Sequence, residues 1–165
     1  MKKIIIVLFL ILVVSFVFAS AESDSLIAKL KSESESEKAV TLLDLAQIYL
    51  YRNTDSALEY SKQSLELSRK HKVERTECKA LKIIGSAYSQ MQEFQEAEEI
   101  LFEGLQLAIE RKFEDIIPEF NFRLGNNYEY SFNYEKALKY YILAEQAWTK
   151  SDQLVDVAGI NKSIG

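Results

Sequence analysis

The chain has 165 residues, which is enough for one modest domain. Apolar residues make up 48% and charged residues 27%, the ordinary balance of a folded soluble protein, and the formal net charge is −5. Only five glycines and one proline are present, too few for the many tight turns of a sheet protein, so helices are favoured.

The first 21 residues have the pattern of a secretory signal peptide. A basic start, Met1-Lys2-Lys3, precedes sixteen residues without a charge, and the small-x-small pattern Ala19-Ser20-Ala21 follows. This leader predicts an exported protein, in the periplasm or outside the cell. The alternative is an uncleaved N-terminal anchor in the inner membrane, although sixteen residues fall short of the ~20 that cross a bilayer comfortably.

Removal of this segment would make the chain more acidic. Residues 1–21 contain two lysines and no acidic residue, so the remainder has 18 basic and 25 acidic residues and a net charge of −7. An acidic exported domain is a poor binder of nucleic acid or anionic lipid. We therefore expect no nucleic-acid partner, and no membrane contact beyond the possible anchor. The single cysteine, Cys78, has no disulfide partner in the chain, so stability has to come from packing.

Residues 22–37 are expected to form a short helix and a polar connector. The helix is expected in DSLIAKL, residues 24–30. The serine-rich KSESESEKA, residues 31–39, then indicates a solvated connector and a helix N-cap rather than a nucleophile.

A pattern with a period of 40 residues runs through the rest of the chain. Gly85, Gly125 and Gly165 are 40 residues apart, and Ala46 stands 39 residues before the first of them. A tyrosine lies three residues after Ala46, Gly85 and Gly125. After a short break, an alanine begins the second segment of each repeat. Apolar spacing of i, i+3, i+4 and i+7 predicts helix in both segments, hence antiparallel helical hairpins. The residues assigned to repeat packing are Ala46, Tyr49, Ala57, Gly85, Tyr88, Ala97, Gly125, Tyr128 and Ala137.

These hairpins define one domain, 38–165, with repeats at 38–74, 75–113 and 114–151 and a partial fourth at 152–165. Glycine inside a helix costs about 1 kcal/mol against alanine, so its recurrence at one phase indicates a packing requirement. Helices approach to about 8–10 Å only where the contact residues are small. We therefore expect three small-residue pairs across the hairpins: Gly85 with Ala97, Gly125 with Ala137, and Ala46 with Ala57.

The arrangement resembles the tetratricopeptide repeat, most closely in LGNNYEYSFNYEKALKYYILA (124–144) and IGSAYSQMQEFQEAEEILFEGL (84–105). The resemblance covers about 39–165 and implies an all-α fold, a right-handed α-solenoid of antiparallel helix hairpins. Exported bacterial tetratricopeptide proteins and the sensory regions of signalling proteins look similar. The common period is about 34 residues, and the extra residues are expected between hairpins, in HKVERTE (71–77) and FEDII (113–117).

The resemblance also implies that the first helix of each hairpin lines a concave groove. Family members that clamp a C-terminal carboxylate have Lys and Asn where this chain has Leu43 and Gln47, so that activity is not expected. A wall of amides and aromatic rings suits a peptide or a helix of a partner protein. Alanine at Asn126 or Glu129 is expected to weaken partner capture and to leave the fold intact. The candidate groove residues are Gln47, Tyr51, Lys82, Ser86, Gln90, Phe122, Asn126, Glu129 and Tyr130.

No catalytic, cofactor-binding or metal-binding constellation is apparent. His71 could be a general base, but a basic last turn that complements a helix dipole explains it as well. Glu93 to Glu103 could pair carboxylates, but their spacing favours a solvated face. Cys78 could be a reactive thiol or a small core residue. We expect no enzyme, no cofactor and no metal.

The leading hypothesis is a non-enzymatic scaffold that binds a protein or peptide on the concave face. The alternative is the N-terminal sensory region of a truncated bacterial signalling protein, a histidine kinase or a transcriptional regulator. A hydrophobic run of ~20 residues in the gene after further repeats would favour this alternative.

The end of the chain gives the first testable expectation. Residues 152–165 match only the first helix of a fourth hairpin, and an apolar side of that helix would lack its partner. We expect a fragment that is folded through the third repeat, frayed from about residue 151, and able to self-associate through the open C-terminal end. Hydrogen exchange should be fast in 151–165 and slow in 81–150. Firm protection to Gly165 in a monomer would contradict this expectation.

Overall fold

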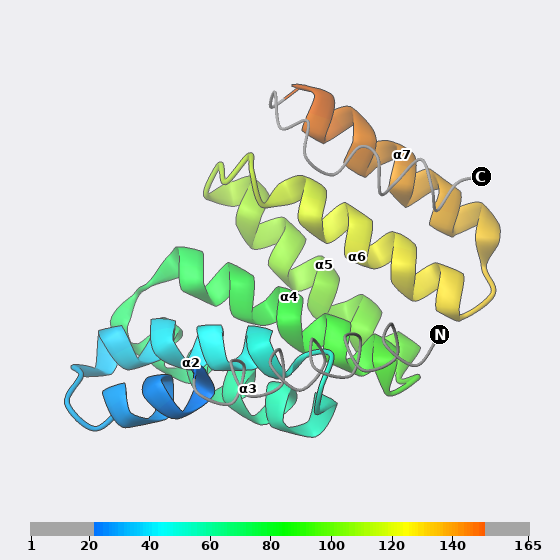
Figure 1. Cartoon of the computed structure of the whole chain (residues 1–165). Helices are drawn as coiled ribbons and strands as arrows, with labels where there is room; N and C mark the ends of the chain where they lie inside the picture. The colour runs from blue at the N-terminus through cyan, green and yellow to red at the C-terminus, as the bar shows by residue number, and fades with distance from the viewer. Residues whose placement is uncertain (1–21, 151–165) are drawn as a thin grey trace, which may run out of the picture.

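The computed structural model describes residues 22–150, and these form helices joined by turns. The predicted class, an all-α solenoid of antiparallel helix hairpins, is confirmed (Figure 1). A short helix at 22–29 precedes the hairpins. The expected leader and the expected partial fourth repeat lie outside the described residues. The six helices that follow are α2 (Glu35–Tyr49), α3 (Thr54–His71), α4 (Glu74–Gln90), α5 (Phe94–Glu110), α6 (Ile117–Tyr130) and α7 (Tyr134–Lys150).

The extra length of each repeat lies mainly in the helices. The prediction that HKVERTE would connect two hairpins is wrong, because α3 runs to His71 and α4 begins at Glu74. Only Lys72 and Val73 remain between them, and Lys72 ends the helix in the left-handed region with φ 57°. FEDII does lie mostly in a connection, which runs from residue 111 to 116. Helices of 17 or 18 residues therefore account for most of the longer period.

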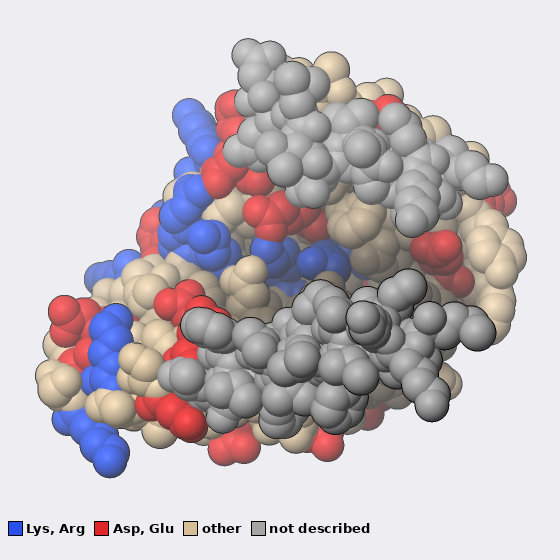
Figure 2. All heavy atoms as spheres, viewed as in Figure 1, with Lys and Arg blue, Asp and Glu red and all other residues tan. Residues whose placement is uncertain are grey.

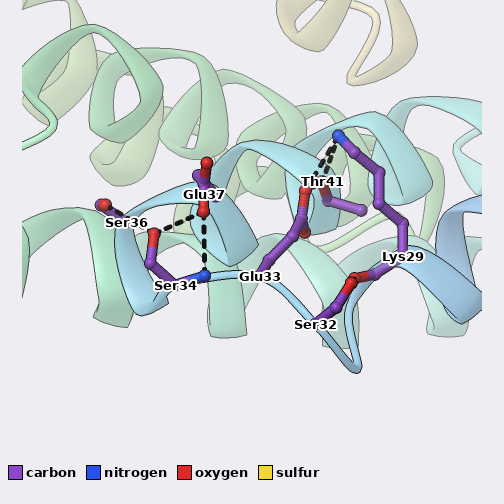
Figure 3. A network of polar contacts seen from close by, with 7 residues as sticks. All are labelled: Lys29, Ser32, Glu33, Ser34, Ser36, Glu37 and Thr41. Atoms are coloured by element: carbon purple, nitrogen blue, oxygen red, sulfur yellow. Dashed lines mark hydrogen bonds and ion pairs between the residues drawn. The ribbon is translucent and has the colours of Figure 1, made fainter.

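The start of the first hairpin is held by side chains of the serine-rich connector. The backbone N–H of Ser34 donates to Glu37 Oε2 at 2.9 Å, which satisfies an amide at the N-terminus of α2. Lys29 pairs with Glu33 at 2.8 Å, and the Thr41 hydroxyl donates to the same Glu33 oxygen at 2.9 Å. Figure 3 shows this network, which ties the helix at 22–29 to α2.

Helix α4 forms the centre of the described structure, because it is buried on two sides. Ala80, Ile83 and Ala87 pack toward α2 and α3 with Ala46 and Ala57. Cys78 and Leu81 belong instead to a second apolar cluster, which is built with residues of α5, α6 and α7. Helix α4 therefore lies between the two apolar clusters of the described residues and contributes to both.

The mid-helix glycines allow close contacts between helices. The residue that each glycine contacts lies one helical turn after the alanine that the sequence predicted. A Cβ at Gly85 would lie 2.5 Å from Leu101 Cγ, with the Ala97 carbonyl oxygen further away at 3.4 Å. A Cβ at Gly125 would lie 2.5 Å from Tyr141 Cδ1 and Cε1, so its nearest neighbour is not Ala137. The small residue leaves room for a large side chain of the partner helix rather than for another small one.

Gly125→Leu tests this contact. Four additional carbons would occupy the space of the Tyr141 ring, which is almost fully buried. We expect a loss of about 3 kcal/mol in the free energy of unfolding, the upper end of what overpacking costs, measured by circular dichroism in urea.

The matched control is Gln106→Leu on the exposed side of α5, where the change should stay within about 0.5 kcal/mol. Equal stability of Gly125→Leu and the control would contradict the assigned helix contact.

Candidate functional site

A small polar cleft of about 20 Å³ lies where the ends of α2, α4 and α6 come together. Five of the nine predicted groove residues line it, and two residues that were not among the nine, Ser89 and Arg123, complete it. The lining residues are Tyr51, Ser86, Ser89, Gln90, Arg123, Asn126 and Tyr130.

The other predicted groove residues do not line this cleft. Gln47 is exposed on α2. Lys82 forms an ion pair with Glu119 of the next hairpin. Phe122 packs against the rings of Tyr141 and Trp148, at 5.6 and 5.8 Å between centroids, and so belongs to the core. The side chains of Lys82 and Phe122 are therefore already engaged within the fold.

Asn126 and Glu129 have a structural contact that the sequence did not reveal. The Tyr141 hydroxyl lies 2.9 Å from Asn126 Oδ1 and also contacts the Glu129 carboxylate. Burial and the hydrogen bond to Glu129 raise the pKa of the Tyr141 hydroxyl, so this hydroxyl stays protonated and donates the hydrogen bond. Alanine at Glu129 would remove an acceptor from a buried hydroxyl and is expected to cost stability, in contrast to the sequence-based expectation.

A wider cleft of about 620 Å³ adjoins the polar one at the turns of the second and third hairpins. It shares Ser89, Gln90 and Tyr130 with the polar cleft. It adds Gln92, the rings of Phe94 and Phe132, and Glu129, which is therefore a sixth predicted groove residue that lines a cleft. Phe132 is 78% exposed and adopts φ 60°, a backbone region that a bulky side chain rarely occupies. Lys72, Gln92 and Lys112 adopt the same conformation after α3, α4 and α5, so it belongs to the way these helices end, and the exposed ring is what distinguishes Phe132.

A buried amide fixes the base of both clefts. The Ser89 hydroxyl donates to Asn127 Oδ1 at 2.8 Å, and Asn127 Nδ2 donates to the Phe94 carbonyl at 2.9 Å. Asn127 is buried, so these bonds hold the end of α4, the start of α5 and α6 in one arrangement.

Arg123 closes the polar cleft across the superhelix. Its Nη1 donates to the Tyr51 hydroxyl at 3.1 Å, which links the first hairpin to the third over a separation of 72 residues. Figure 2 shows Lys and Arg side chains gathered in the hollow of this face. The signal for Arg123 was available in the sequence, because it lies three residues before Asn126 and seven before Tyr130, on one face of a helix.

The residues considered for catalysis have structural environments. His71 is exposed in a basic last turn of α3 with Arg69 and Lys70. In the acidic stretch, Glu98 accepts a hydrogen bond from Tyr128 at 2.5 Å, and Glu103 pairs with Arg69. Within residues 22–150, no group of His, Cys, Asp and Glu could hold a metal ion, and no helix there is long and apolar enough to cross a membrane.

No sequence profile of a known protein family matches the chain, and neither does any curated protein. Solved structures share its fold. A Rap protein complexed with Competence and Sporulation Factor superposes with a TM-score of 0.72 and 22% identity over 76% of this chain and 36% of that chain. The apo form of RapI gives a TM-score of 0.72 and 22% identity over 83% and 51%. Aspartyl phosphate phosphatase F from Bacillus subtilis gives a TM-score of 0.77 and 17% identity over 83% and 37%.

These similarities show a tetratricopeptide-like helical-repeat fold. Identities of 17 to 22% show the fold alone. The chain spans between 36% and 51% of the length of the three neighbours.

Cys78 provides a test of the core around α4. The side chain is fully buried, and burial, with the nearby Glu77 charge, raises the pKa of the thiol to about 11. We expect iodoacetamide to label the native chain at least about tenfold more slowly than the urea-unfolded chain at neutral pH. Since only the unfolded thiol ionises between about pH 9 and 11, this group should lower stability as the pH rises through that window. Equal labelling rates would show that Cys78 is accessible.

Proposed function

We propose that this chain is a non-enzymatic binding scaffold that holds a peptide or protein segment on its concave face. The observation that carries this proposal is the polar cleft between the hairpins, where free amide donors meet aromatic rings. The Gln90 oxygen accepts from the Thr54 hydroxyl and the Asn126 oxygen from Tyr141, and within residues 22–150 neither side-chain NH₂ group has a partner, so both can donate to a ligand. Amide donors of this kind suit the carbonyl groups of an extended peptide.

The wider cleft supplies apolar contact for the same ligand. Tyr130 is 51% and Phe132 78% exposed, and both line it with Phe94. Aromatic rings that stay exposed beside polar groups are frequent at protein-binding surfaces, since they bury a large area at a small cost in side-chain entropy. A large apolar side chain of the partner would lie in this cleft of about 620 Å³, with a single polar group of the partner at the small polar cleft beside it.

The names of the structural neighbours are compatible with two kinds of activity. One neighbour is described in complex with Competence and Sporulation Factor, and another is named a phosphatase. We favour binding for this chain, because His71, Cys78 and the acidic stretch have structural roles. The alternative is that the chain is the sensory region of a longer signalling protein. The gene sequence after codon 165 would test this alternative.

We further propose that the N-terminal segment is a leader, so that this binding takes place outside the cytoplasm. Its support is the uncharged segment 4–19 with the small residues after it. Cell fractionation of the tagged chain, together with N-terminal sequencing, distinguishes a cleaved leader from an anchor.

The binding surface is tested with peptides selected from a phage-displayed random library on the immobilised full chain. Tyr130→Ala should weaken the selected synthetic peptides by about tenfold or more, because Tyr130 lines both clefts. Gln106→Ala, on an exposed part of α5, should leave their dissociation constants unchanged.

Fluorescence anisotropy measures both variants, and circular dichroism checks that each is folded. A parent chain that selects no peptide would overturn peptide binding. Weakening by Gln106→Ala and not by Tyr130→Ala would place the binding surface elsewhere.

A further inference from the structure

The hydrogen bond between Tyr51 and Arg123 differs from other polar contacts between hairpins, because it passes over a complete hairpin. Tyr51 follows α2 of the first hairpin, and Arg123 lies on α6 of the third, 72 residues later. In a helical stack each hairpin normally contacts only its neighbours. The Ser89–Asn127 hydrogen bond, at 2.8 Å, follows that rule, since it joins the second hairpin to the third. The Tyr51–Arg123 contact therefore depends on how strongly the whole stack curves.

This contact also determines how much of the polar cleft is open. Tyr51 and Arg123 both line the cleft, and they bond to each other from different hairpins. The remaining volume of about 20 Å³ holds about one water molecule. The amide groups of Gln90 and Asn126 lie in the same cleft. A partner therefore reaches these amides with no more than one polar group while the contact is formed.

The two side chains of the contact are held with different firmness. Arg123 is half-buried, and its guanidinium lies 5.7 Å from the centroid of the Phe122 ring. That ring packs in turn against the buried Tyr141 ring, at 5.6 Å between centroids. Tyr51 is 72% exposed on the turn after α2. Its side chain can turn away from Arg123 without uncovering the core, because water then replaces the guanidinium as the partner of the hydroxyl.

We propose that the Tyr51–Arg123 contact is a latch on the groove. In the free chain it holds the first hairpin to the third and limits access to the amides of the polar cleft, and a peptide reaches these amides when the contact opens. This inference rests on the proposed function and concerns access to the groove rather than the chemistry of the peptide. Because only the open fraction of the chain binds fully, the latch lowers the apparent affinity in proportion to that fraction.

The first measurement follows the opening in the full chain without any peptide. Glu59→Cys and Lys139→Cys place spin labels at exposed positions that are equivalent in α3 and α7, and double electron–electron resonance gives the distance between them. Cys78 can remain, because its thiol is buried and reacts slowly. Tyr51→Phe removes the hydroxyl and keeps the ring, so it should shift the distance distribution to longer values.

The matched control is Tyr134→Phe, which removes the hydroxyl from a ring that is 63% exposed. Tyr134 lies on α7 and lines neither cleft, and its ring contacts the Phe132 ring at 6.4 Å between centroids. Tyr134→Phe should leave the distance between the labels unchanged. Circular dichroism checks that both variants are folded.

The second measurement is the affinity for the peptides that the parent chain selects from the random library. Tyr51→Phe should bind them about threefold to tenfold more tightly, the range expected when one hydrogen bond no longer has to be broken. Tyr134→Phe should bind them as the parent does. Added peptide should also lengthen the distance between the labels in the parent to the value found with Tyr51→Phe.

The outcomes separate the latch from the binding function. An unchanged label distance or an unchanged affinity with Tyr51→Phe would overturn the latch and leave the binding function standing. Weaker binding to Tyr51→Phe would also overturn the latch, since the hydroxyl would then serve the peptide directly. The same conclusion follows if Tyr134→Phe changes the label distance as much as Tyr51→Phe does. A parent chain that selects no peptide would overturn the proposed function and, with it, the role of the contact as a latch.

Discussion

The described structure depends on places where a helix has no room for a Cβ atom. A Cβ at Gly104 of α5 would lie 2.3 Å from the Phe120 ring of the next hairpin, as Gly85 and Gly125 would clash with Leu101 and Tyr141. The first contact joins neighbouring hairpins, and the other two close the hairpins themselves. Such close approach fixes how each helix lies on the next, because any added carbon would force the ring or the helix to move.

The position of the groove follows from this packing. Tyr51 and Arg123 are 72 residues apart in sequence and belong to hairpins separated by a complete one, yet their polar atoms lie 3.1 Å apart. The stacking of three hairpins brings them together, and α4, which is buried on two sides, lies between the first hairpin and the third. The candidate site is thus a consequence of the stack rather than of any single hairpin.

The fold could be predicted from the sequence because its signals are local and repeated. The period of 40 and the helical spacing required only the printed residues. The residue that contacts each glycine could not be predicted to within one helical turn, because the contact depends on where the opposite helix has a large side chain. Tyr141 therefore replaced Ala137 as the neighbour of Gly125.

The groove could be predicted only in part for a similar reason. The resemblance to the tetratricopeptide repeat, with positions counted from the small residue of each repeat, identified Ser86, Gln90 and Asn126, which line the cleft. It could not show that Glu119 of the next repeat holds Lys82. Nor could it show that Phe122 lies against the rings of Tyr141 and Trp148. Which polar side chains remain available to a ligand is decided by contacts between repeats, and these lie about 40 positions apart in the chain.

The charges on α6 show how one helix can serve packing and binding together. Glu119 and Arg123 are four residues apart, a spacing at which opposite charges commonly pair on a helix. Here Lys82 of the preceding hairpin takes the carboxylate, and the guanidinium is left with neutral partners. The ion pair between Lys82 and Glu119 thus stabilises the contact between hairpins. Because Glu119 pairs with Lys82, it does not neutralise the charge of Arg123. Asn126 divides its amide in the same way, with the oxygen toward Tyr141 of the core and the NH₂ group toward the cleft.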